Sequence, residues 1–113
     1  MTSQGSARGR FQRALQIRSV TQAEDAAREL GWVSLLDAVD LCVLFAQEAP
    51  ERYERAARRL LERLVTEREA LTLDHAQLAI SCLRGLRLGD PDLLADVLRV
   101  LAGGRQGSSG YWR

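Results

Sequence analysis

The segment SLLDAVDLCVLFAQE, residues 34–48, decides the fold of this 113-residue chain. From Leu35 onward it is apolar on almost every side, and its only acidic residues before the last turn are Asp37 and Asp40. A helix of this kind must be surrounded by other helices, because nearly all of its surface has to leave water. Ser34 is a typical helix cap, whose hydroxyl accepts a backbone N–H of the first turn. We therefore expect this helix at the centre of the fold.

Further amphipathic segments lie on both sides of this helix in the sequence. In each, apolar residues recur at intervals of three and four, which indicates one buried helix face. Hydroxyl caps, prolines and glycines mark where these helices begin and end. The predicted helices begin at Arg10, at Thr21 with a capping box to Glu24, at Pro50, at Thr72 and at Asp90-Pro91, while Gly31 and Gly103-Gly104 end two of them.

Composition supports the same fold class. The chain has 19 Leu and 15 Ala, which favour helices, and few of the β-branched residues that favour strands. We expect an all-α fold, a compact array of five to six helices in antiparallel pairs. The predicted domain covers residues 10–102, between a disordered basic arm at 1–9 and a flexible Gly/Ser tail with an aromatic end at 103–113.

Two parts of the chain resemble each other. The segment 34–38 aligns with 72–76, since each has a hydroxyl cap, a Leu and an Ala at matching positions. Each helix is followed by a proline, Pro50 or Pro91, that begins a partner helix. A helical hairpin cannot bury its apolar face alone, so stacking a second copy would supply the missing surface. One interpretation is a degenerate two-helix repeat, and the other is that any two capped amphipathic hairpins share these positions.

The opening helices resemble a known family. The run RFQRAL at 10–15 and the run AEDAA at 23–27 are similar to helix pairs of tetratricopeptide-type repeats. The chain departs from that pattern because it has no Trp-x-x-Leu-Gly element and no clean second copy. Residues 10–101 also resemble small, uncharacterised, all-helical proteins of high-GC bacterial genomes, on the run RYERAARRLLERL at 52–64. These resemblances imply a helical fold and no functional residues.

Arginines spaced three and four residues apart form one row on the helix after Pro50. Guanidinium groups in a row can bind phosphates or an acidic partner. Glu51 and Glu62 run along the neighbouring line, and this pattern is also typical of a helix surface that only faces water. The row consists of Arg52, Arg55, Arg59 and Arg63.

Both ends of the chain carry further candidate binding residues. The first twenty residues have arginines and no acidic residue, a composition typical of arms that bind nucleic acid but also of solvated termini. The last residues place two aromatic side chains after a Gly/Ser linker, where they can anchor a partner or simply end the chain. These candidates are Arg8, Arg10, Arg13 and Arg18 in the arm, and Tyr111 and Trp112 in the tail.

No residue pattern indicates catalysis or a cofactor. Cys42 and Cys82 lie at positions typical of core residues, and His75 has no ligand-like spacing to them. Asp37 and Asp40 could form a carboxylate pair, but acids in the first turns of a helix also oppose its dipole. We expect no enzyme, no cofactor and no metal site.

The predicted function is therefore an interaction. No long apolar run or secretory signal is present, so we expect a cytoplasmic protein that does not enter a membrane. The favoured hypothesis is a non-enzymatic helical module, an adaptor or regulatory subunit that binds another protein or a second copy of itself. The alternative is a nucleic-acid-associated regulator that uses the arginine arm and the arginine row.

Overall fold

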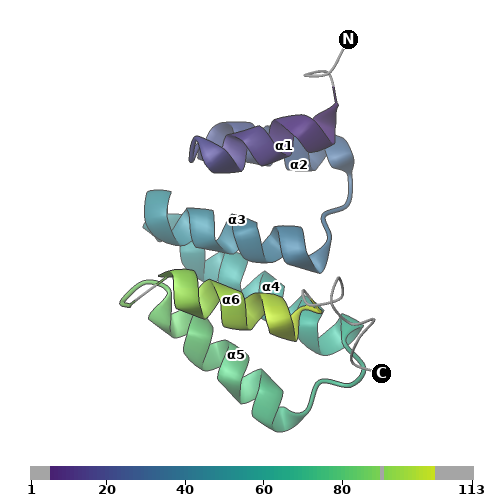
Figure 1. Cartoon of the computed structure of the whole chain (residues 1–113), viewed down its shortest axis with the longest axis vertical. Helices are drawn as coiled ribbons and strands as arrows, with labels where there is room; N and C mark the ends of the chain where they lie inside the picture. Colours follow the sequence, from purple (N-terminus) through teal and green to yellow (C-terminus); the bar gives the residue numbers. More distant parts are fainter. Residues whose placement is uncertain (1–5, 90, 104–113) are drawn as a thin grey trace.

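The computed structural model describes residues 6–89 and 91–103, and these residues form an all-α fold. They contain six α-helices and a short 3-10 turn, with no strand among them, so the predicted fold class is confirmed. Figure 1 shows the helices in order along the chain. The helices are α1 (Ala7–Gln16), α2 (Val20–Leu30), α3 (Leu35–Glu48), α4 (Tyr53–Glu67), α5 (Leu73–Gly85) and α6 (Pro91–Leu101), with the 3-10 turn η2 (Pro50–Arg52) before α4.

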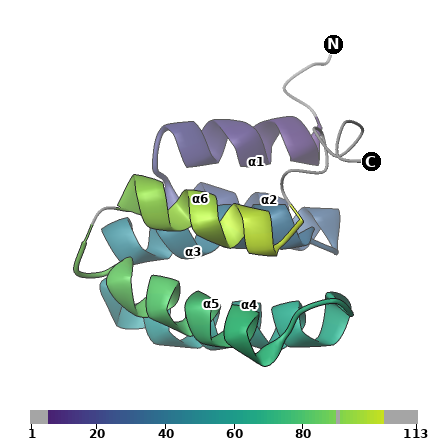
Figure 2. The same ribbon diagram turned by 60° about the horizontal axis from the view of Figure 1, so that its bottom comes forward.

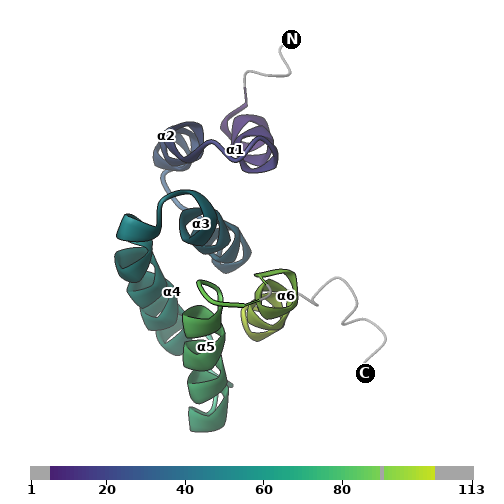
Figure 3. The same cartoon turned by 90° about the vertical axis from the view of Figure 1, so that its left-hand side faces the viewer.

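The helices contact one another most closely as three sequential pairs, α1 with α2, α3 with α4, and α5 with α6. The second and third pairs are the hairpins that the internal alignment predicts, while a duplication of one hairpin stays a prediction. The α1–α2 pair lies on one side of α3, and α4, α5 and α6 lie on the other (Figures 1 and 3). In Figure 2, α5 runs beside α4, and α6 lies above α5; α6 packs against α5 and α3.

The central position of α3 follows from its apolar surface. One side of the helix, with Leu35, Val39 and Cys42, belongs to the larger apolar cluster, which joins α3, α4, α5 and α6. Another side, with Leu44 and the half-buried Leu41, belongs to the smaller cluster under α1 and α2. The helix thus links two cores, and the prediction that it lies at the centre of the fold is confirmed.

Most of the predicted helix boundaries are confirmed because they depend on local contacts. Ser34 Oγ accepts the backbone N–H of Asp37, and Gly31 ends α2 at a φ of 80° that favours glycine. Pro50 begins the 3-10 turn that leads into α4. At the start of α5, Thr72 and His75 form a reciprocal capping box in which His75 Nδ1 accepts the Thr72 N–H. His75 therefore has a structural role.

Two predictions about the N-terminal helices are wrong. The first helix begins at Ala7 instead of Arg10, because Ser6 Oγ accepts the N–H of Gly9 and caps it. Residues 7–9 are thus helical, not part of a disordered arm, while residues 1–5 lie outside the described residues. The second helix is capped by Ser19, which accepts the N–H of Gln22, so Thr21 lies inside the helix and forms no capping box.

The turn between these helices explains the second difference. Arg18 has a φ of 59°, a left-handed conformation that a residue with a Cβ rarely adopts. This reverses the chain directly after α1, and the backbone N–H of Ser19 donates to the carbonyl of Ala14 at 2.9 Å. The second helix can therefore begin earlier than the sequence indicates.

Candidate interaction groove

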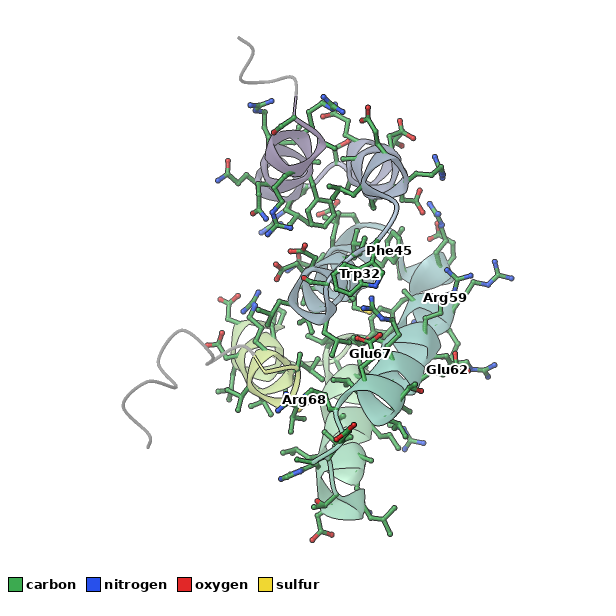
Figure 4. All side chains as sticks on the ribbon, turned by 90° about the vertical axis from the view of Figure 1, so that its right-hand side faces the viewer. Trp32, Phe45, Arg59, Glu62, Glu67 and Arg68 are labelled. Atoms are coloured by element: carbon green, nitrogen blue, oxygen red, sulfur yellow. The ribbon has the colours of Figure 1, made fainter. Side chains whose placement is uncertain are left out.

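A groove of about 930 Å³ runs between α2, α3 and α4. Its floor consists of apolar residues of α3, and its two sides are α2 and α4. Figure 4 shows Phe45 beside α3 and Arg59 on the facing α4. The floor residues are Ala38, Leu41, Cys42 and Phe45.

The floor is a third face of α3. Residues at spacings of three, four and seven share one face of a helix, so Ala38, Leu41 and Phe45 form a continuous apolar strip along two turns. Neither apolar cluster covers this strip completely, since Ala38, Leu41 and Phe45 are only half-buried. The all-round apolar character of α3 therefore serves both cores and also leaves an open apolar surface.

The predicted arginine row forms the α4 edge of this groove. All four arginines line it, and so do Glu51, Glu54 and Glu62 of the same segment. Arg52 forms an ion pair with Glu24 of α2, and its guanidinium lies 5.2 Å from the ring centre of Phe45. This contact joins α2 to the η2 turn before α4, across one end of the groove.

Arg63 is held near the other end. Its Nε donates to Glu67 Oε2 at 2.7 Å, and this hydrogen bond lowers the pKa of the Glu67 carboxyl. Its guanidinium also lies 5.5 Å from the ring centre of Trp32, in the loop before α3. Trp32 remains 68% exposed, beside the groove (Figure 4). Large exposed aromatic side chains are typical anchors of protein interfaces.

The two central arginines of the row have no such contacts. Arg55 and Arg59 are exposed, and neither forms an ion pair within residues 6–89 and 91–103. Glu51 and Arg55, four residues apart, form no ion pair within these residues, whereas Arg58 pairs with Glu54 at 3.4 Å. Arg55 and Arg59 therefore present two positive charges along the edge of an apolar floor.

The arginines of the predicted N-terminal arm lie elsewhere. Arg8 pairs with the buried carboxylate of Asp37, Arg10 pairs with Glu29, and Arg18 lies 3.7 Å from Glu48. These contacts fasten α1 to α2 and α3. The fourth, Arg13, is exposed on α1. Tyr111 and Trp112 lie outside the described residues.

Asp37 and Asp40 of α3 also form ion pairs with arginines of neighbouring helices. Asp37 is 4% exposed and lies in the first turn, as the dipole argument expects. Asp40 accepts two hydrogen bonds from Arg99 of α6, the shorter at 2.8 Å. The two carboxylates therefore hold neighbouring helices to α3.

The remaining candidates for chemistry are structural. Burial raises the pKa of the Cys42 thiol to about 12, and its Sγ lies 3.3 Å from the carbonyl oxygen of Ala56, to which it donates. Burial also raises the pKa of Cys82, so both thiols stay protonated and are poor nucleophiles near neutral pH. Within the described ranges, no three His, Cys, Asp or Glu side chains gather as metal ligands do. None of the described helices has the length and apolar character of a membrane span.

Comparison with known proteins adds no relative. No protein-family model, curated protein or solved structure gives a significant match to this chain. The resemblances to tetratricopeptide-type hairpins and to small helical bacterial proteins therefore stay predictions.

Proposed function

We propose that this protein is a non-enzymatic interaction module whose α2–α3–α4 groove binds an acidic, amphipathic helix of a partner protein. The observation that carries the proposal is the apolar strip of α3 beside Arg55 and Arg59, which are exposed on the facing edge of the groove. An acidic partner would complement these guanidinium groups, which form no ion pair of their own within the described residues.

The form of the partner follows from the groove. Its sides are helices, and the described residues offer no strand edge to which an extended peptide could add. A helix laid in a groove contacts it through residues at i, i+3 or i+4, and i+7. The floor of α3 repeats this spacing, since Ala38, Leu41 or Cys42, and Phe45 follow it. An amphipathic helix about two turns long would cover the whole strip.

The nucleic-acid alternative has less support. It requires the arm and the row to offer free arginines together, but three of the four arm arginines contact acidic side chains of α2 and α3. In the row, Arg52 and Arg63 are also paired with glutamates. The protein-binding proposal needs only Arg55 and Arg59.

A pair of designed peptides tests the proposal without knowledge of the natural partner. Both are amphipathic helices of about four turns with the same leucine strip, one flanked by glutamates and the other by lysines. We expect the glutamate peptide to bind the full chain about tenfold more tightly than the lysine peptide. The double variant Arg55→Glu with Arg59→Glu should reverse this preference, which isothermal titration calorimetry would measure.

A matched control separates a local effect from a general change of charge. The double variant Arg13→Glu with Arg87→Glu makes the same charge change at exposed positions outside the groove. It should leave the preference for the glutamate peptide unchanged. If the wild-type chain binds both peptides equally or not at all, or if both double variants behave alike, the proposal is wrong.

A further inference from the structure

The outer face of α5 carries exposed apolar residues that none of the other described helices covers. Leu73 is 88% exposed and Leu88, just beyond the helix, 89%, while Leu78 and Ile80 lie between them at 45% and 38%. This helix lies at the end of the array opposite to α1 and α2 (Figures 1 and 3). Its inner face packs on α4 and α6, so its outer face is available to another molecule.

Two residues of this face carry opposite charges near the two ends of α5. Asp74 lies near the start of α5 and Arg84 near its end, both are exposed, and neither forms an ion pair within the described chain. Ten residues separate them, so they are about 15 Å apart along the helix and cannot pair within one molecule. Near the helix start a carboxylate is favourable and near the helix end a guanidinium is favourable, so the helix presents opposite charges at its two ends.

We propose that this face binds the same face of a second copy, with the two α5 helices antiparallel about a two-fold axis at the height of Ala79. In such a pair, residues equally far before and after position 79 lie opposite each other. Asp74 of each copy then meets Arg84 of the other, which forms two equivalent ion pairs. The pattern is self-complementary, as a two-fold interface requires.

The uncharged residues fit the same axis. Gln77 of one copy lies opposite Ser81 of the other, a donor and acceptor combination at the centre of the face. Leu78 and Ile80 lie next to the axis on the two edges of the face, so Leu78 of one copy is level with Ile80 of the other. Leu73 of one copy is level with Gly85, the last residue of α5, in the other, and the exposed Leu88 follows just beyond it. In a dimer with this single two-fold axis, the exposed leucines and the isoleucine are covered and both charged residues are paired.

This interface is separate from the groove, because none of its residues lines the space between α2, α3 and α4. One pair of helices forms a small interface, so we expect a dissociation constant in the micromolar range. The dimer could thus present two grooves at once, which increases binding to a partner with two acidic helices.

Charge exchange tests the proposed dimer directly. Sedimentation velocity of the full chain between about 1 and 300 μM should show a monomer that becomes a dimer. Asp74→Arg alone or Arg84→Asp alone places like charges opposite each other, and each should weaken dimerisation about tenfold or more. The double variant with both changes restores opposite charges at both ends, so its dimerisation should return to near the wild-type level.

One control variant and two contradicting results complete the test of the dimer. Asp25→Arg changes an exposed acid of α2, far from α5, and should leave the dimer intact. Circular dichroism verifies that each surface variant is folded. A wild-type chain that stays monomeric throughout, or a double variant no better than the single ones, overturns the proposal. Neither result affects peptide binding in the groove, so the two proposals fail independently.

Discussion

Replacing Val39 by Asp is expected to unfold the domain. Val39 is 0% exposed and lies on the side of α3 that packs into the larger apolar cluster. A carboxylate there would lose its water without gaining a partner, which costs about 4 kcal/mol or more. Domains of this size are stable by only about 5–15 kcal/mol. Circular dichroism and urea unfolding should show loss of most helical structure.

Val65→Asp is the matched control for this change. It introduces the same side chain into α4, at a position that is 56% exposed. Its effect on the free energy of unfolding should stay within about 1 kcal/mol, since the carboxylate remains in water. If Val39→Asp is as stable as Val65→Asp, then this side of α3 is not buried in the larger apolar cluster.

Replacing Phe11 by Ala should release the first two helices from the rest of the domain. Phe11 is 0% exposed and is the largest side chain of the smaller cluster, whose other buried members are alanines and Leu44. Deleting a buried phenylalanine ring costs about 3–5 kcal/mol. The larger cluster contains no residue of α1 or α2, so its helices should remain folded.

Hydrogen exchange followed by mass spectrometry distinguishes this local effect from global unfolding. In Phe11→Ala, amides of α1 and α2 should lose protection while those of α4, α5 and α6 retain it. Ile17→Ala removes a large side chain that is 56% exposed at the end of the same helix, and should leave protection nearly unchanged. Equal loss of protection in all six helices would show that the two clusters unfold as one unit.

The sequence predicts this fold well where local chemistry determines it. The central place of α3 follows from its all-round apolar surface, and the caps at Ser34 and Thr72 follow from residues within one turn. The start of α2 was predicted wrongly because it depends on the left-handed conformation of Arg18. The spacing of apolar residues contains no information on that conformation.

The candidate site was predictable only in part. The arginine row of α4 is visible from its spacing, but the apolar strip opposite to it requires knowledge of how α2, α3 and α4 pack. Trp32 was missed because it lies in a loop, outside any periodic pattern. The contacts of Asp37 with Arg8 and of Asp40 with Arg99 join residues far apart in the chain, and helical periodicity cannot reveal such pairs.

The most direct test of the proposed function is a nuclear magnetic resonance titration of the isotope-labelled full chain with the glutamate-flanked peptide. Backbone amide shifts should concentrate at the groove, on the floor from Ala38 to Phe45 and around Arg55 and Arg59 on α4. The outer face of α5 should shift little at the same peptide concentration. Shifts centred on another surface, or none at a peptide concentration of about 1 mM, would contradict the proposal that this groove is the binding site.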